Sequence, residues 1–187
     1  MRFDHVIYGT GDLDAASAKV EAELGLPVLP GGSHEGQGTH NRIVPFVSGF
    51  LELLAIRDRD EAAASPVGSI LLERIEAGDG WLAWAVNVDD VAVVAERLGT
   101  DLYTVRRDGK EAHLTGVTEA LREPCLPFFG HSNMRPIRGD VALDWIEVSG
   151  DEARVRDWLG DHDLPLRSVD GPPAVRAISV GGREFRP

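Results

Sequence analysis

Residues 34–52, HEGQGTHNRIVPFVSGFLE, are the stretch from which the rest of this chain can be interpreted. The stretch contains two histidines, an Asn-Arg pair and a glutamate, separated by glycine-containing turns. From residue 42 to residue 56 the apolar pattern predicts two strands that join at Ser48-Gly49. Because side chains that hold metals or substrates are concentrated here, this stretch is the first candidate for a functional site.

Two-residue periodicity assigns faces to the strands near this stretch. Glu52 falls on a face with apolar neighbours, and in the first strand of the chain Phe3, His5 and Ile7 share one face. A lone buried charge is costly, so Glu52 needs a partner. An ion pair with Arg42 or a hydrogen bond with His5 would supply that partner without any metal.

The chain around this stretch repeats one pattern three times. Each copy begins with an apolar strand, continues through a short turn that contains an aspartate, and ends in an amphipathic helix closed by Leu-Gly. The aspartates stand where an N-cap carboxylate accepts orphan backbone N–H groups, and the glycines stand where a left-handed C-cap residue is favoured. The caps are Asp12 and Gly25, Asp90 and Gly99, and Asp151 and Gly160. The alternative to a true repeat is that three ordinary strand–helix units share these features.

Further strand patterns follow each Leu-Gly, so each copy predicts a β-α-β-β-β unit within one domain of 187 residues. In the second unit Asp108-Gly109 predicts a hairpin turn. In the connector after the first unit, Pro66 predicts the first turn of a helix that runs to Ala77. The predicted modules are residues 1–57, 80–132 and 142–187, the last one truncated, with linkers at 58–79 and 133–141.

Composition narrows the range of partners. The chain carries 31 acidic and 19 basic residues, a formal net charge of -12, which disfavours nucleic acid and anionic membrane surfaces. No apolar run is long enough to span a bilayer, and the N-terminus lacks the pattern of a signal peptide, so we expect a cytoplasmic protein. The single cysteine, Cys125, follows Pro124 in an apolar strand and predicts a buried thiol.

Repeated β-α-β-β-β units with a histidine in the first strand and a glutamate in the last resemble the vicinal oxygen chelate superfamily. That superfamily includes glyoxalase I, extradiol dioxygenases, fosfomycin-resistance proteins and bleomycin-binding proteins. Residues 31–56 are similar to its glyoxalase-like branch, with His, Gly-Thr, Asn-Arg and Leu-Glu-Leu in order, and LPFFGHS at 126–132 resembles a later strand of that branch. The resemblance implies an α+β fold in which repeated βαβββ modules form curled mixed β-sheets around a cup, with helices on the outside.

The resemblance also implies metal ligands on the first and last strands of each unit. His5 and Glu52 match the two positions of the first unit, and His131 lies in the last strand of the second. Ala83 stands near the remaining position and cannot ligate a metal. A set of two histidines and one carboxylate would suit a divalent Zn, Ni, Mn or Fe ion with positions open for substrate.

Substrate contacts are implied for the polar residues within the opening stretch. Strand alternation places His40 and Arg42 on one face and Asn41 on the other, so only one of these sets faces the cup. Arg42 would hold a carboxylate or an enolate in bidentate fashion, and the alternative is an ion pair with a surface acid. The candidate substrate-binding residues are His34, Thr39, His40, Asn41 and Arg42.

The leading functional prediction is a glyoxalase-like enzyme that acts on a small oxygenated metabolite with lyase, isomerase or related chemistry. The metal would stabilise an enediolate or another oxyanion as a Lewis acid, and Glu52 would be the catalytic residue that moves the proton. The alternative is a metal-free protein of the same fold that binds or sequesters a small molecule. A small molecule is the expected partner, and a homodimer is compatible because members of the superfamily commonly dimerise.

Overall fold

The computed structural model describes residues 1–107, 110–132 and 138–187. The elements of the first half are β1 (Arg2–Gly9), α1 (Leu13–Leu24), β2 (Leu29–His34), β3 (Thr39–Pro45) and β4 (Phe50–Ile56). Two helices, α2 (Arg59–Ala63) and α3 (Pro66–Glu76), lead to the second half. Its elements are β5 (Gly80–Asn87), α4 (Val91–Leu98), β6 (Leu102–Arg107), β7 (Lys110–Thr115), α5 (Val117–Arg122) and β8 (Phe128–Ser132). The last segment contains β9 (Leu143–Ser149), α6 (Glu152–Leu159), β10 (Leu166–Val169), β11 (Ala174–Val180) and β12 (Arg183–Phe185).

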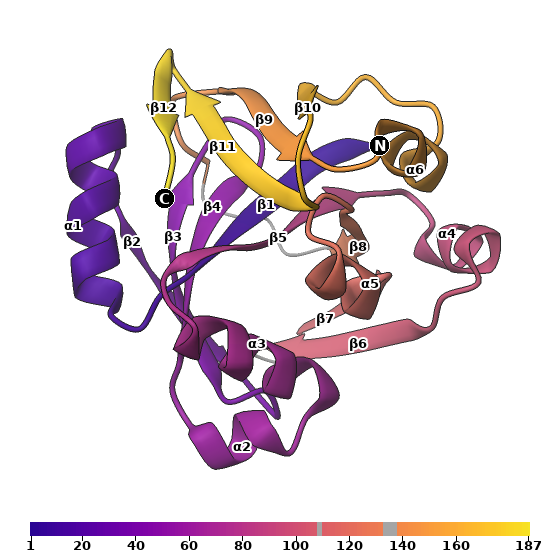
Figure 1. Cartoon of the computed structure of the whole chain (residues 1–187). Helices are drawn as coiled ribbons and strands as arrows, with labels where there is room; N and C mark the ends of the chain where they lie inside the picture. The colour runs from indigo at the N-terminus through magenta and orange to yellow at the C-terminus, as the bar shows by residue number, and fades with distance from the viewer. Residues whose placement is uncertain (108–109, 133–137) are drawn as a thin grey trace.

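Both halves contribute to one large mixed sheet. In the described ranges eight strands pair in the order β2-β3-β4-β1-β5-β8-β7-β6. The first strand of each half is parallel to its fourth, β1 with β4 and β5 with β8, and the halves join along antiparallel β1 and β5. The sheet curls until β2 lies near β6. Figure 1 shows β1 in the middle of this sheet, between β4 and β5. This arrangement confirms the predicted α+β fold with a curled mixed sheet and helices around it.

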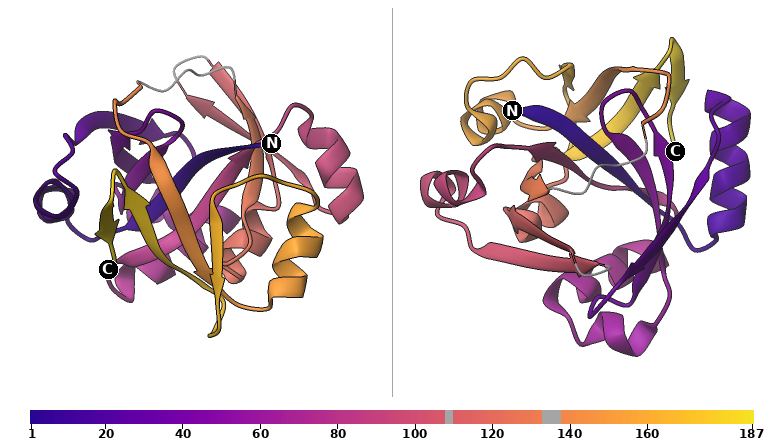
Figure 2. Two further views of the ribbon diagram at one scale, coloured as in Figure 1. Left: turned by 90° about the horizontal axis from the view of Figure 1, so that it is seen from above. Right: turned by 180° about the vertical axis from the view of Figure 1, so that it is seen from behind.

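The last segment forms a separate sheet with its own strand order, β10-β9-β11-β12. Here the first strand, β9, is parallel to β10 and antiparallel to β11, whereas β1 pairs with the fourth strand of its unit. Figure 2 shows this second sheet stacked over the β1–β5 junction, between α1 and α6. The three segments therefore share a strand–helix beginning, and the third continues with a different strand order.

The helices that follow β1, β5 and β9 all begin with the same kind of N-cap. Asp12, Asp90 and Asp151 each accept hydrogen bonds from two backbone N–H groups in the first turn of their helices, as predicted. Gly25 closes α1 in the left-handed conformation with φ 68°, and Gly99 closes α4 in the same way. A β-carbon would be strained in that conformation, so glycine is favoured there.

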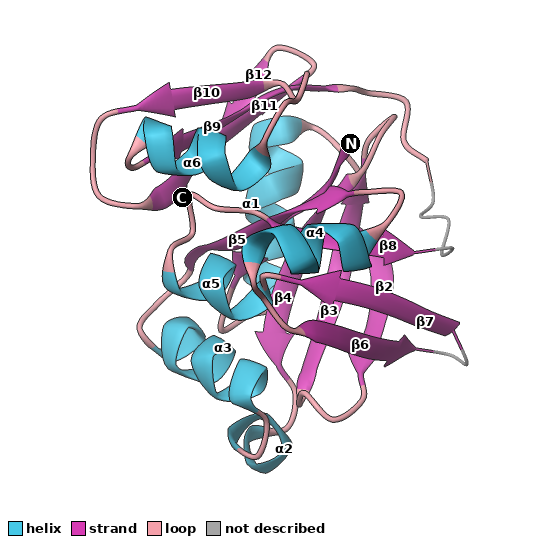
Figure 3. Ribbon diagram, turned by 90° about the vertical axis from the view of Figure 1, so that its right-hand side faces the viewer, coloured by secondary structure: helices cyan, strands magenta, loops and turns pink. Residues whose placement is uncertain are grey.

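Two apolar cores lie on opposite faces of the large sheet. The core under the second sheet includes Val6 and Tyr8 of β1 and Trp84 of β5, together with side chains of α1 and α6. On the other face, α3 and α5 pack against Ile7 and Leu54, which lie on the concave side of the curl. Figure 3 shows α3 and α5 on the opposite side of β5 from the second sheet. The concave side is therefore partly filled by helices.

A β-bulge changes the predicted alternation of β1. The pairing with β5 shifts register between Phe3 and His5, and Phe3 packs in the same core as Val6 and Tyr8. Ile7 packs in the other core. The prediction that Phe3 shares a face with His5 and Ile7 was wrong, because the bulge reverses the alternation within three residues.

The connector between the halves contains the predicted helix. Ser65 caps α3, Pro66 occupies its first turn, and Ala77 follows its last residue. No helix in the described ranges is long and apolar enough to cross a membrane. The predicted Asp108-Gly109 turn and residues 133–137 of the second linker lie outside the described residues.

Candidate functional site

A buried carboxylate on the concave side is the centre of the candidate site. Glu52 lies in β4 and is only 6% exposed. The side-chain amide of Asn41, on neighbouring β3, donates a hydrogen bond to Glu52 Oε1. The Asn41 Oδ1 atom accepts from the backbone N–H of Gly32 at 2.8 Å, which fixes the orientation of the amide. The carboxylate is therefore held in place by a residue that is itself anchored.

One imidazole faces each oxygen of this carboxylate. The Nε2 atom of His5 lies 3.7 Å from Glu52 Oε2, and the Nε2 atom of His34 lies 3.7 Å from Glu52 Oε1. The two histidine side chains are 14% and 17% exposed, so they form the partly open border of a buried charge. His5 comes from β1 and His34 from the end of β2, which brings three strands to one point.

The surroundings of His5 fix its ring. Its Nδ1 atom lies 2.7 Å from a carboxylate oxygen of Asp4. Its ring stacks on Phe50 at 4.8 Å with an interplanar angle of 9°, and Phe128 of the second half meets it edge-on at 5.4 Å. The second half of the sheet therefore contributes an aromatic wall beside His5.

The charges around His5 and Asp4 shift the pKa values of both side chains. Burial acts to lower the pKa of His5, but the hydrogen bond and negative charge of Asp4, together with the charge of Glu52, outweigh it and raise that pKa above 6.5. For Asp4, burial acts to raise the pKa, but the hydrogen bond and charge of His5 and the charge of Arg2 lower it below 3.8. His5 is thus favoured as a cation between two carboxylates.

His34 has a different second partner. Its Nδ1 atom lies 2.9 Å from the hydroxyl of Thr39, a fully buried residue directly opposite it in the β2–β3 pair. Thr39 and Asn41 lie two residues apart on β3, so both point to the concave side with Glu52. Among the predicted substrate-binding residues, these two and His34 are brought together around the carboxylate.

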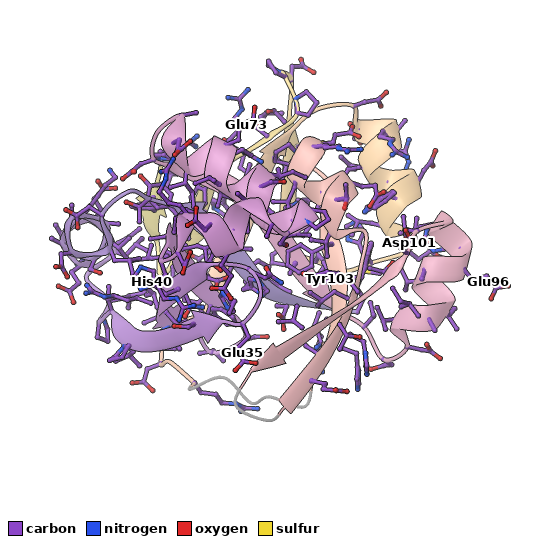
Figure 4. All side chains as sticks on the ribbon, turned by 90° about the horizontal axis from the view of Figure 1, so that it is seen from below. Glu35, His40, Glu73, Glu96, Asp101 and Tyr103 are labelled. Carbon is purple, nitrogen blue, oxygen red and sulfur yellow. The ribbon has the colours of Figure 1, made fainter. Side chains whose placement is uncertain are left out.

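Arg42 and His40 lie on the opposite face of β3. The guanidinium of Arg42 contacts helix α1, with distances of 2.5 Å to Asp14 Oδ1, 2.9 Å to Ser17 Oγ and 3.3 Å to the carbonyl oxygen of Leu13. Figure 4 shows the labelled His40 on the side of the molecule where α1 lies. This geometry matches the alternative in which Arg42 pairs with a surface acid; its role in substrate binding stays a prediction.

His131 lies away from the Glu52 cluster. Its Nδ1 atom lies 3.0 Å from the carbonyl oxygen of Val88. Phe128, three residues earlier on β8, contacts His5, so alternation turns His131 to the other face of the sheet. Across the β1–β5 junction, Ala85 stands opposite His5 and supplies no donor atom. The structure brings His5 and Glu52 together and leaves His131 apart from them.

The fit of a metal ion can be tested on these donor atoms. Over residues 1–107, 110–132 and 138–187, no group of three or more His, Cys, Asp or Glu side chains is arranged to hold a metal ion. His5 and His34 face different oxygens of Glu52, so the carboxylate separates the two imidazoles. His5, Glu52 and His131 therefore do not surround a common position where a metal ion could bind.

A side-chain contact closes the curl between the first and last strands of the sheet. Gln37, in the β2–β3 turn, donates from Nε2 to the hydroxyl of Tyr103 on β6 at 2.7 Å. The same turn is tied to α2, since the N–H of Gly36 donates to Glu61 at 2.5 Å. Figure 4 labels Glu35 of this turn and Tyr103. The turn therefore links both halves next to His34.

Cys125 takes no part in the cluster. It is buried, and burial together with the nearby charge of Glu123 raises the pKa of its thiol to about 11. At neutral pH it remains a thiol, which is a poor nucleophile.

Three contributors to the site could not be assigned from the sequence. Asp4 precedes His5 by one residue, so strict alternation would turn the two side chains apart; the bulge in β1 allows them to meet. Phe128 reaches His5 only because the two halves join along β1 and β5. The closeness of His34 to Glu52 depends on the register of β2 on β3. Of these three features, only the adjacent Asp4-His5 pair could be seen in the sequence.

A curled mixed sheet made of two strand–helix–strand units, with polar side chains on its concave side, defines a protein of the vicinal oxygen chelate fold. The model of the Glyoxalase-like domain family matches residues 3–161, and the chain belongs to this family. None of the curated proteins matches it.

Solved structures share this fold at low identity. A hypothetical protein from Staphylococcus aureus is 16% identical with a TM-score of 0.68, and the match covers 93% of this chain and 87% of that one. A Streptomyces coelicolor methylmalonyl-CoA epimerase in complex with 2-nitronate-propionyl-CoA is 23% identical with a TM-score of 0.53, covering 72% of this chain and 99% of that one. The Mycobacterium tuberculosis methylmalonyl-CoA epimerase is 22% identical with a TM-score of 0.51, covering 72% and 88%.

Proposed function

We propose that this protein is a glyoxalase-like enzyme that moves a proton on a small oxygenated metabolite, with lyase or isomerase chemistry. The observation that carries the proposal is the buried carboxylate of Glu52, held by Asn41 between the Nε2 atoms of His5 and His34. Titratable groups that are buried together and oriented by further hydrogen bonds are typical of acid–base sites. Glu52 is the proposed catalytic base.

The residues divide the chemistry between them. Glu52 accepts a proton from a carbon next to a carbonyl group, and the amide of Asn41 keeps the carboxylate from rotating. Protonated His5 presents an Nε2–H group to the same space, where it donates to the oxyanion that forms on the substrate. The rings of Phe50 and Phe128 exclude water from one side of His5, which strengthens that hydrogen bond.

A divalent metal ion, which the fold family implies, is a separate part of the proposal. His5 and Glu52 would be its first ligands, and the second half supplies no third ligand among the residues that the structure describes. Elemental analysis of the purified protein tests this directly. Zn, Ni, Mn or Fe bound at one ion per chain and lost from both His5→Ala and Glu52→Ala would establish the metal site; metal-free protein with unchanged activity would dismiss it.

The second candidate function is a metal-free binding protein of the same fold. It is favoured by the described part of the second half, which faces His5 with Ala85 and the ring of Phe128 and contributes no acid or base there. In that case the cluster would recognise a carbonyl or hydroxyl group of a ligand without changing it.

Solvent exchange distinguishes the two functions. The protein is incubated in deuterated buffer with a panel of small ketones, 2-oxo acids, 2-hydroxy acids and acyl-CoA esters, and deuterium at the carbon next to the carbonyl is followed by NMR. CoA esters are included because the epimerase neighbours bind them. An enzyme incorporates deuterium into at least one class, whereas a binding protein shifts ligand signals without exchange.

The matched variants are Glu52→Gln and Asp14→Asn. Glu52→Gln keeps the size of the side chain and removes the base, so exchange should fall by about 10²–10⁴-fold. Asp14→Asn alters an exposed carboxylate of α1, which pairs with Arg42 on the other face of β3, and should leave exchange unchanged. Exchange that persists at the wild-type rate in Glu52→Gln would contradict the assigned base.

A further inference from the structure

A pair of histidines lies on the outer face of the large sheet, which is the face opposite the concave side. His113 of β7 and His131 of β8 stand directly opposite each other in the antiparallel pairing of these two strands. Thr115 and Phe129 form another pair two residues along, and both are buried on the face where Phe129 joins the core under the second sheet. Because residues two apart on a strand share a face, both histidines lie on this outer face.

The two imidazoles are close enough to share one ion. His113 is exposed and His131 is half-buried, so the pair can be reached from solvent. The β-carbons of directly opposite residues lie about 4.5–5.5 Å apart. Two nitrogen atoms that bind one zinc ion at about 2.0–2.1 Å each lie within about 4 Å of each other. Histidine side chains that start from opposite positions can therefore meet at a single ion.

Each ring is held through its Nδ1 atom on the side away from the other ring. The Nδ1 atom of His113 lies 3.2 Å from the hydroxyl of Thr104 on β6, and that of His131 lies 3.0 Å from the carbonyl oxygen of Val88, which follows β5. The strand order is β5-β8-β7-β6, so both partners flank the pair from outside. An imidazole carries Nδ1 on one edge and the Cδ2–Nε2 bond on the opposite edge. Both Nε2 edges are therefore turned toward the space between the rings.

These contacts also leave Nε2 ready to bind a metal ion. A carbonyl oxygen only accepts, so Nδ1 of His131 carries the hydrogen and Nε2 of the neutral ring carries a lone pair. Histidines that bind metals usually donate from the other ring nitrogen to a carbonyl oxygen, a carboxylate or water. Within the part of the chain that the structure describes, no hydrogen bond or ion pair engages Nε2 of His113 or His131.

We propose that His113 and His131 form a binding site for a divalent transition-metal ion, with their Nε2 atoms as two ligands. No third His, Cys, Asp or Glu of the described ranges completes a set with them, so water fills the remaining positions. Imidazole ligands suit Ni²⁺, Cu²⁺ and Zn²⁺, of which Cu²⁺ is bound most tightly. The formal net charge of -12 favours the approach of cations. This site goes beyond the proposed function, because it lies on the other face of the sheet from Glu52.

Isothermal titration calorimetry of the untagged whole chain with Cu²⁺, and separately with Zn²⁺, tests the site. The titrations are run at neutral to mildly alkaline pH, because an imidazole binds a metal only in its neutral form. We expect saturable binding at the pair, and electron paramagnetic resonance of the Cu²⁺ complex should show two coordinated imidazoles. Loss of a group that only orients a ligand costs about 10–100-fold in metal affinity, so His113→Asn and His131→Asn should each lower the affinity by at least about 100-fold.

Two further variants separate this geometry from general binding by surface histidines. Thr104→Val removes the hydroxyl that orients His113 and keeps both ligands, so the affinity should fall by about 10-fold. His162→Asn alters an exposed histidine between two aspartates and should leave the affinity unchanged. Circular dichroism and thermal unfolding confirm that each variant is folded.

Glu52→Ala distinguishes this site from the cluster on the concave side. Metal that stays bound in Glu52→Ala and is lost from His113→Asn belongs to the histidine pair, whereas the reverse pattern assigns the metal to the cluster and overturns the inference. Absence of saturable binding of either ion in the wild type would also overturn it, as would wild-type affinity in folded His113→Asn and His131→Asn. The measurement needs no substrate, so it gives the same answer whether or not the exchange assay finds an activity.

Discussion

The partner of Arg42 depends on the fold and could not be identified from the sequence. From the sequence alone, Arg42 could either bind a carboxylate or enolate of the substrate or form an ion pair with a surface acid. The guanidinium joins β3 to α1 through Asp14, Ser17 and the carbonyl oxygen of Leu13. Since one residue of register decides between the two faces of a strand, the choice could not be made from the sequence.

We predict that Arg42→Ala reduces stability slightly and leaves the exchange reaction unchanged. The Asp14 partner is 85% exposed and Arg42 is 35% exposed, and such pairs contribute about 0.2–1 kcal/mol. Urea unfolding of Arg42→Ala, Asp14→Asn and the double variant measures the coupling. A loss of exchange in Arg42→Ala with normal exchange in Asp14→Asn would instead restore Arg42 as a substrate contact.

Asp4 and His5 form a residue pair whose effect on stability depends on pH. The raised pKa of His5 means that its stabilising contribution is complete below the unfolded value of 6.5 and is lost as pH rises through the folded pKa. The lowered pKa of Asp4 means that its contribution is complete above the unfolded value of 3.8 and is lost as pH falls through the folded pKa. The pair therefore stabilises the fold most between pH 3.8 and 6.5.

Urea unfolding at a series of pH values tests this dependence. The free energy of unfolding of the wild type, relative to that of Asp4→Asn, should be largest in the mildly acidic window and should decline toward alkaline pH. Asp14→Asn is the control, because the partner of this exposed carboxylate is the guanidinium of Arg42. A difference between wild type and Asp4→Asn that stays constant from acid to alkaline pH would contradict the assignment.

At the scale of elements, the helix boundaries were the most predictable part of the fold. Asp12, Asp90 and Asp151 act as N-caps, and Pro66 starts α3, because these effects depend on neighbouring residues only. The β-bulge in β1 was not predictable in this way. It arises where β1 pairs with β5, about 80 residues later in the chain.

Asp90→Ala should destabilise the protein by about 1 kcal/mol, because two N–H groups of α4 lose their acceptor. Asp89→Ala provides a matched control, since Asp89 is the exposed neighbour just before the cap. Thermal unfolding of both variants under the same conditions measures the difference. Equal losses in the two variants would show that net charge, and not the cap, is responsible.

At the scale of the whole molecule, the site depends on how the two halves join. His5, Glu52, Asn41, Thr39 and His34 all come from the first half, so their closeness could be anticipated in part from the opening stretch. His131, the donor expected from the second half, lies apart from these residues, and Phe128 stands beside His5 instead. That substitution follows from strand register across the junction, which local sequence patterns do not determine.

The second sheet shares an apolar core with the large sheet. The Staphylococcus aureus neighbour covers 93% of this chain, so its match extends well into the segment that forms this sheet. Phe185 of β12 is fully buried and meets Tyr8 and Trp81 of the large sheet edge-on, with ring centroids 5.5 Å apart in both contacts. Such contacts make the outer core continuous between the two sheets.

Phe185→Ala should therefore lower the free energy of unfolding by about 3–5 kcal/mol, because it removes a large ring from a closed core. Unfolding should stay a single transition when followed both by tryptophan fluorescence and by circular dichroism, since the two sheets share that core. Val169→Ala, on exposed β10, is the control and should change stability by at most about 0.5 kcal/mol. If the second sheet were an independent attachment, Phe185→Ala would produce a separate early transition and leave the midpoint of the large sheet unchanged. A single shifted transition distinguishes a sheet that supports β1, and with it the position of His5, from one that only covers it.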